Sequence, residues 1–153
     1  MYLKKSYEKE ISMELTLADK ILELKYQLTE VINFFPDPTF MLNKSGEVIA
    51  WNPAMEELTN IKAKEILGKS SYEYSLPFYE ERSWVLANLA MTPSKEMEKR
   101  FDSLQIEKDT IFAEFFLPHL KSGGKYVWAK AKPIYDLQGN IVGAIETIRD
   151  IAY

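Results

Sequence analysis

The amino-acid sequence predicts an α+β fold, in which an antiparallel sheet carries helices on one face and follows a long N-terminal helix. Three observations support this prediction. Residues 7–35 form an uninterrupted helical pattern, short apolar runs then form strands in two groups, and helical segments lie between those groups. Hairpin-linked strands on both sides of a helical segment favour an antiparallel sheet with its helices on one face.

The N-terminal helix is predicted because residues 7–35 contain no glycine or proline and are rich in helix formers. Pro36 and Pro38 end this helix, since a proline disfavours helical geometry at the residue before it. The chain is therefore expected to divide into residues 1–35, an amphipathic helix, and residues 36–153, a core domain.

Apolar residues recur along this helix at alternating spacings of three and four, which are the a and d positions of a coiled coil. We expect the helix to pair with its counterpart in a second chain and form a parallel homodimer. The alternative is a monomer in which the apolar stripe folds back over the outer face of its own sheet. The expected dimer interface comprises Leu17, Ile21, Leu24, Leu28, Val31 and Phe35.

The first two predicted strands, Thr39–Asn43 and Val48–Trp51, flank a Ser-Gly turn and form a hairpin. Asn52 and Pro53 follow at once, an N-cap residue and a proline suited to the first position of a helix. Further along, the apolar spacing within residues 79–91 predicts an amphipathic helix.

Three more strands are predicted near the C-terminus, at residues 110–117, 125–132 and 141–148. Glycine-containing turns separate them, which favours two consecutive hairpins. The pattern weakens at residues 94–109, where 104–106 fits a short strand that is not counted. The expected sheet therefore has five strands.

Four short motifs occur in a characteristic order. They are the hairpin that runs into Asn52-Pro53, the Tyr126-Val-Trp128 strand, the segment from Pro133 to Gly143, and the terminal Asp150-Ile151-Ala152. Together they resemble the PAS domains of archaeal and bacterial sensory histidine kinases. In the last motif Ala152 stands where threonine is common. The resemblance covers roughly residues 31–152, which is most of the chain, and implies the strand order 2-1-5-4-3. It also implies that Arg149, Asp150 and Ile151 act as a signal relay, with the acidic residue paired near the sheet.

The resemblance implies a non-enzymatic sensory or interaction module of a two-component signal-transduction system. Binding of a ligand or partner would rearrange the sheet, and the change would pass to the flanking helices and to a downstream effector such as a histidine kinase. The alternative is a redox or light sensor that holds a flavin or haem. An enzyme is disfavoured, because the sequence pairs no nucleophile with a base and no adjacent acids into a dyad.

A ligand cavity is expected between the helix-covered face of the sheet and the helices near residues 72–89. Alternation along the strand places the small residues Ala129 and Ala131 on that face, and Lys130 and Lys132 on the opposite face. We therefore expect exposed lysines rather than anion ligands. The predicted lining of the cavity is Met41, Trp84, Phe115 and Ala129.

Composition narrows the chemistry further. A formal net charge of −4 disfavours nucleic acid as a partner, and no apolar run is long enough for a membrane span. The absence of cysteine excludes a cysteine–flavin adduct and is typical of a cytoplasmic protein. The single histidine, His119, is followed by Leu120 rather than an acidic residue, so neither a haem ligand nor a phospho-acceptor is expected there, and no metal site is expected. The sequence leaves the identity of any cofactor open.

Overall fold

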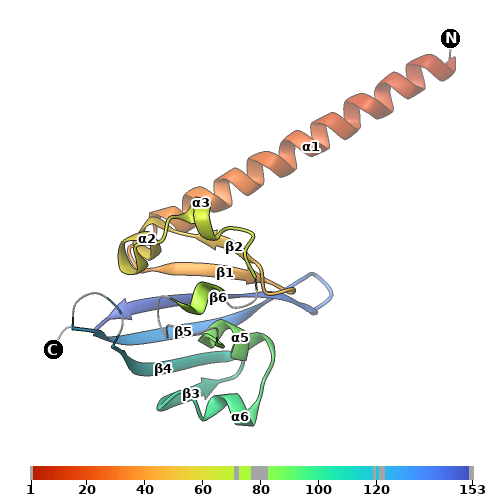
Figure 1. Cartoon of the computed structure of the whole chain (residues 1–153). Coiled ribbons are helices and arrows are strands. Elements are labelled where there is room, and N and C mark those ends of the chain that lie inside the picture. The colour runs from red at the N-terminus through yellow and green to blue at the C-terminus, as the bar shows by residue number, and fades with distance from the viewer. Residues whose placement is uncertain (1, 71–72, 77–82, 119, 121–122, 152–153) are drawn as a thin grey trace. The chain divides into compact units, whose positions relative to one another are not determined.

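A computed structural model of the chain describes residues 2–70, 73–76, 83–118, 120 and 123–151. The contacts divide it into two units, residues 1–32 and residues 33–153. Figure 1 shows the helix of the first unit and the mixed helices and strands of the second.

The first unit is helical throughout the part that is described, and it belongs to α1, Tyr2–Phe34. Five of the six predicted interface residues lie in this helix, and their side chains are between 52% and 64% exposed. The helix ends at Phe34, so Phe35, which precedes Pro36, lies outside it. Across the described residues, no helix has both the length and the apolar character that spanning a bilayer requires.

The second unit is built on one antiparallel sheet in the order β2-β1-β6-β5-β4-β3 (Figure 1). The two longest strands, β5 and β6, pair over most of their length at its centre. The strands are β1 (Thr39–Asn43), β2 (Val48–Trp51), β3 (Ser103–Glu107), β4 (Thr110–Leu117), β5 (Lys125–Tyr135) and β6 (Ile141–Asp150).

The predicted count of five strands is wrong, because β3 adds a sixth strand at the edge of the sheet. A two-residue turn, Lys108 and Asp109, joins β3 to β4, and Lys108 adopts a positive φ of 57°. Such turns normally carry glycine or asparagine, so the usual sequence signal of a hairpin is missing here. Without β3, the observed order is the predicted order 2-1-5-4-3.

Short helices connect the two strand groups. Contacts join α5 to β4, β5 and β6, α2 to β1, and α3 to β2. The helical segments are α2 (Pro53–Thr59), α3 (Ala63–Ile66), η1 (Glu73–Ser75), α5 (Leu86–Met91) and α6 (Lys95–Glu98). The helix predicted over residues 79–91 is shorter, because residues 83–85 are not helical and α5 begins only at Leu86; residues 79–82 lie outside the described part.

The two faces of the sheet differ in burial because side chains alternate along each strand. One face, called here the inner face, is buried beneath α5, and its central residues are less than 2% exposed. The opposite, outer face carries half-buried and exposed aromatic and basic side chains. Inner-face residues of the core include Phe40, Leu42, Ala113, Val127, Ala129, Ala131 and Ala144.

Candidate functional site

The segment that follows α1 is bonded to the last residues of β6. The carbonyl of Pro38 accepts hydrogen bonds from the Ile148 N–H (2.9 Å) and from the Thr147 hydroxyl (3.2 Å). The Arg149 guanidinium pairs with the Asp37 carboxylate at 2.8 Å. The segment that follows α1 and the end of β6 are therefore held together. The contacts of Asp37 and Pro38 with residues 147–149 are called here the junction.

The buried side chain of Asn52 also binds the segment that follows α1. Asn52 Oδ1 accepts from the N–H of Met55, which caps α2, and from the N–H of Thr39, each at 3.0 Å. Its Nδ2 donates to the carbonyl of Asp37 at 3.0 Å. Asn52 therefore connects the first core helix, the first strand and the residues after α1 through a single side chain.

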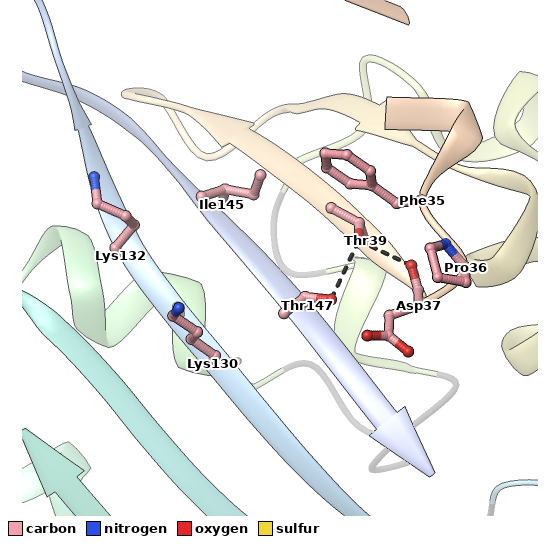
Figure 2. A pocket seen from close by; sticks show the side chains of 9 residues that line it. Phe35, Pro36, Asp37, Thr39, Lys130, Lys132, Ile145 and Thr147 are labelled. Carbon is pink, nitrogen blue, oxygen red and sulfur yellow. Dashed lines mark hydrogen bonds between the residues drawn. The ribbon is translucent and has the colours of Figure 1, made fainter. Parts of the chain in front are cut away.

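A pocket of about 390 Å³ opens on the outer face beside the junction. Figure 2 shows Phe35, Pro36 and Asp37 on one side and Lys130 and Lys132 of β5 on the other, with side chains of β1 and β6 between them. The Thr39 hydroxyl donates to the carbonyl of Asp37 at 2.9 Å and lies 3.3 Å from the Thr147 hydroxyl. The lining is Phe35, Pro36, Asp37, Thr39, Lys130, Ala131, Lys132, Ile145 and Thr147.

Cations lie over aromatic rings along this face. The Arg149 guanidinium is 5.6 Å from the Trp128 ring, the Lys130 ammonium is 5.7 Å from the ring of Phe112, and the Lys132 ammonium is 5.5 Å from that of Tyr135. The rings hold the charges close to the sheet by cation–π attraction. The part of the outer face formed by β5 and β6 is thus both aromatic and positively charged.

The four residues predicted to line one ligand cavity do not come together. Cross-strand pairing places Met41 opposite Ile145, which is opposite Lys132, so Met41 lies on the outer face, whereas Ala129 is buried on the inner face. The expectation failed because alternation orders the residues within a strand but does not say which set of another strand shares their face.

The other two predicted lining residues, Phe115 and Trp84, have different contacts. Phe115 meets Phe101 edge to face, with ring centroids 5.9 Å apart. Trp84 is half-buried and lines a pocket of about 340 Å³ with Tyr74 and Asn88, next to the turn between β1 and β2. Because residues 77–82 lie outside the described part, the predicted inner cavity stays a prediction.

The three relay residues each have a defined contact. Arg149 pairs with Asp37, as described above, and Asp150 pairs with Lys125 at 3.3 Å. The Ile151 N–H donates to the carbonyl of Tyr126 at 2.9 Å, and the Ile151 side chain is half-buried. These contacts attach the end of β6 to both the incoming segment and β5.

Sequence reasoning missed Glu146, which lies on the inner face and is 2% exposed. Its Oε1 accepts a hydrogen bond from the Ala87 N–H at 2.8 Å, at the start of α5. Burial raises the pKa of Glu146 to about 8, although the Ala87 N–H acts in the opposite direction. The alternation of Ala144, Glu146 and Ile148 along β6 was the signal that could have revealed it.

Two further predictions concern single groups. His119 lies outside the described residues, so its expected lack of a haem or phospho-acceptor role stays a prediction. In the part of the chain that the structure describes, no cluster of three histidine or acidic side chains is arranged to hold a metal ion.

The fold of the domain is a central antiparallel sheet, in which the first and last strands pair, with helices on one face. The PAS fold family matches residues 26–151. The chain belongs to the PAS family. A comparison with curated proteins gives no match.

Solved structures of similar fold include PAS domains. The PAS domain of BvgS from Bordetella pertussis has 18% identity and a TM-score of 0.57, covering 86% of this chain and 87% of that one. The PAS domain of an HTR-like protein from Haloarcula marismortui has 16% identity and a TM-score of 0.50, covering 89% and 98%. VqmA of Vibrio cholera, in a complex with ligand and DNA, has 14% identity and a TM-score of 0.51; the match covers 82% of this chain but only 50% of VqmA.

Proposed function

We propose that this chain is a non-enzymatic PAS sensory and interaction module, which couples binding of a ligand or partner to its flanking helices and to a downstream effector such as a histidine kinase. Membership of the PAS family supports the sensory class. VqmA, half of which matches this chain in fold, was solved in a complex with a ligand and DNA. The junction supports the coupling.

The junction is the observation that carries the proposal. Residues 35–38 follow directly on α1, and β6 is the last strand in chain order. The Asp37–Arg149 pair and the two bonds to Pro38 make these segments neighbours. A shift of the end of β6 therefore has to displace the residues that follow α1, or break these contacts. A ligand that favours one arrangement of the sheet biases both flanks.

Arg149, Asp150 and Ile151 are proposed as the relay. Arg149 acts toward the incoming segment through Asp37, and Asp150 acts toward β5 through Lys125. The backbone bond from Ile151 to Tyr126 keeps the outgoing chain in line with β5. With one contact on each side, the direction in which the chain leaves β6 is fixed. A helix that follows β6 would start in that direction.

The N-terminal helix is proposed as the homodimer contact, and residues 1–35 and 36–153 as the functional division. The apolar side chains at the a and d positions of α1 are more than half exposed, and leaving them in water is unfavourable in free energy. Phe35 was predicted as part of this seam, but it lies after the helix and lines the outer-face pocket. The seam proposed here therefore consists of Leu17, Ile21, Leu24, Leu28 and Val31.

Hydrogen exchange tests the coupling. Arg149→Gln and Asp37→Asn each break the junction pair, and we expect the amides of residues 26–35 to exchange faster in both. An exposed ion pair contributes little to stability, so the acceleration should be modest, roughly 1.4- to fivefold. The double variant should exchange no faster than either single variant.

Lys95→Gln is the matched control, since it breaks another exposed pair, Lys95–Glu98 at 3.5 Å, that lies outside the junction. It should leave residues 26–35 unchanged. Equal exchange in this segment for the wild type and all junction variants would show that the exit strand does not act on the helix, and the proposed coupling would fail.

The sensory role has its own measurement. Native and denaturing mass spectra of the purified protein, recorded side by side, weigh any ligand that stays bound. An absorption spectrum of the same sample separates the alternative, because visible bands would indicate flavin or haem.

A further inference from the structure

The outer-face pocket combines apolar walls with positive charge on one side. Phe35, Pro36 and Ile145 supply apolar surface, and Lys130 and Lys132 stand on the β5 side (Figure 2). Both lysines leave the same face of β5 because they are two residues apart in the strand. At about 390 Å³, the volume lies within the range of small-molecule sites.

Most other polar groups of the pocket already have partners. The Thr39 and Thr147 hydroxyls donate to the carbonyls of Asp37 and Pro38, and the Asp37 carboxylate is held by Arg149. The Lys132 ammonium donates one proton to the carbonyl of Pro133 at 2.6 Å, which leaves two more to offer.

Within the described part of the chain, neither lysine forms an ion pair with a carboxylate. The hydrogen bond from Tyr135 and, to a smaller extent, the charge of Lys132 lower the pKa of Asp109, so Lys132 interacts with that carboxylate at longer range. Each ammonium rests instead near an aromatic ring, Lys130 near Phe112 and Lys132 near Tyr135. A cation–π contact neutralises no charge, so both ammonium groups can still attract an anion. Two cations beside an apolar hollow favour a ligand with a negative head and an apolar body.

We propose that this pocket binds a small apolar carboxylate, such as an arylalkanoate, with its head on Lys130 and Lys132 and its body against Phe35, Pro36 and Ile145. The inference rests on the proposed function, because it names the class of signal. It places the signal on the open face of the sheet, in direct contact with the residues that follow α1. Such a ligand would tie residues 35–37 to β5, across the strands that form the junction.

The test is a titration of the full chain with 4-phenylbutyrate, followed by ¹⁵N–¹H NMR. We expect amide shifts at residues 35–39, 130–132 and 145–147. Lys130→Gln/Lys132→Gln should weaken binding by about tenfold or more, because it removes the charge-assisted contacts to the carboxylate. The neutral analogue 4-phenylbutan-1-ol should bind the wild type as weakly as the carboxylate binds this variant.

Lys62→Gln/Lys64→Gln is the matched control. It makes the same charge change at the same spacing, on exposed residues at the start of α3. It should bind 4-phenylbutyrate as the wild type does. If the control loses as much affinity as the pocket variant, the effect comes from net charge and the assignment of the pocket is wrong.

Three other outcomes would overturn the proposal. They are equal affinity in the wild type and the Lys130/Lys132 variant, shifts confined to inner-face residues such as Ala113 and Ala129, and no response up to about 5 mM, beyond the roughly millimolar constant of a weak site. Dilution that shifts the same amides without any response to 4-phenylbutyrate would assign the face to a second copy of the chain. None of these results affects the exchange test of the junction, so the two proposals fail separately.

Discussion

Glu146 is a carboxyl group for which the described residues provide no cation. The elements packed around its side chain are β1, β5 and α5, and neither β1 nor α5 carries a charged residue. On β5, Lys130 and Lys132 project from the other face, and Lys125 is paired with Asp150. Among the described residues its hydrogen-bond partner is the Ala87 N–H, and burial keeps this carboxyl protonated near neutral pH in the folded domain.

The stability of the domain should therefore decrease as pH rises. The folded pKa of Glu146 is about 8 and its ordinary value is 4.5, so the folded state binds a proton that the unfolded state has lost between these values. The free energy of unfolding should be highest below about pH 4.5 for this group. It should then decrease by up to about 1.4 kcal/mol per pH unit until about pH 8, where the loss is complete.

Urea denaturation of the wild type and of Glu146→Gln between pH 5 and pH 9 measures this dependence. Glutamine keeps an acceptor for the Ala87 N–H but does not titrate, so the difference between the two proteins isolates Glu146 from the other groups. A difference that does not change with pH would mean that the carboxyl is ionised in the folded state.

Asn52 should contribute more to the free energy of unfolding than an ordinary helix cap does. Its Oδ1 caps α2 and also accepts from Thr39, while its Nδ2 donates to Asp37. Asn52→Ala leaves these buried groups without partners, and we expect a loss of about 2–4 kcal/mol in chemical denaturation. Ser94→Ala removes the single capping bond of α6 to Met97 and should cost only about 1 kcal/mol. Equal losses would reduce Asn52 to a simple cap.

Asn52 and Glu146 show what local sequence patterns can and cannot predict. The Asn-Pro pair was enough to predict the cap of α2, because the capping bond joins residues three positions apart. The bonds from Asn52 to residues 37 and 39 depend on how distant segments meet. The burial of Glu146 depends in the same way on α5 covering β6, and no local pattern contains that information.

At the scale of elements, β1 and β6 lie unusually close at Gly143. A methyl group added there would clash with the Leu42 carbonyl oxygen, so alanine forces the two strands apart. We expect Gly143→Ala to lower stability by about 3 kcal/mol and to accelerate hydrogen exchange across β1.

Gly139→Ala is the control, because its added methyl group meets nothing within 4 Å and only its φ of +85° is unfavourable. It should cost about 1–2 kcal/mol and leave exchange in β1 unchanged. Normal exchange in β1 of Gly143→Ala would show that the sheet accommodates the methyl group.

Element boundaries were predictable where a common turn or a proline ends the helix or strand. The strands on either side of the Ser45-Gly46 turn have the predicted bounds, and α1 ends just before the Phe35-Pro36 step. The β3–β4 hairpin has Lys108 in a conformation that usually calls for glycine, so its turn was not recognised. Similarly, α5 begins late because the Asn88 side chain accepts from the Val85 N–H, a capping arrangement without serine, threonine or aspartate at the cap.

For the whole molecule, the strand order came from family resemblance and the outer-face pocket could not be predicted at all. The pocket draws its lining from residues 35–39, β5 and β6, whose proximity depends on the register of three strands. The lysines were correctly assigned to the face opposite Ala129, but nothing in the spacing indicated a hollow beside them.

The oligomeric state is also a property of the whole molecule. Leu24→Glu/Leu28→Glu places two charges in the proposed seam, and we expect it to convert a dimer into a monomer in light scattering at micromolar concentration. Tyr26→Glu/Thr29→Glu adds the same charge to other faces of the helix and should remain dimeric. A wild type that is already monomeric at high micromolar concentration would end the coiled-coil proposal.

The pairing of β1 with β6 also sets when the domain can fold. Thr39 of β1 pairs with Thr147 of β6, and 108 positions of sequence separate them. Bringing such distant segments together costs loop entropy before any contact repays it, so this pairing slows folding. On the ribosome, the β1–β2 hairpin emerges first and waits with one edge unpaired until residues 141–150 have been synthesised. The sheet is therefore completed in one late step, and a chain stalled before β6 exposes an open edge to its neighbours.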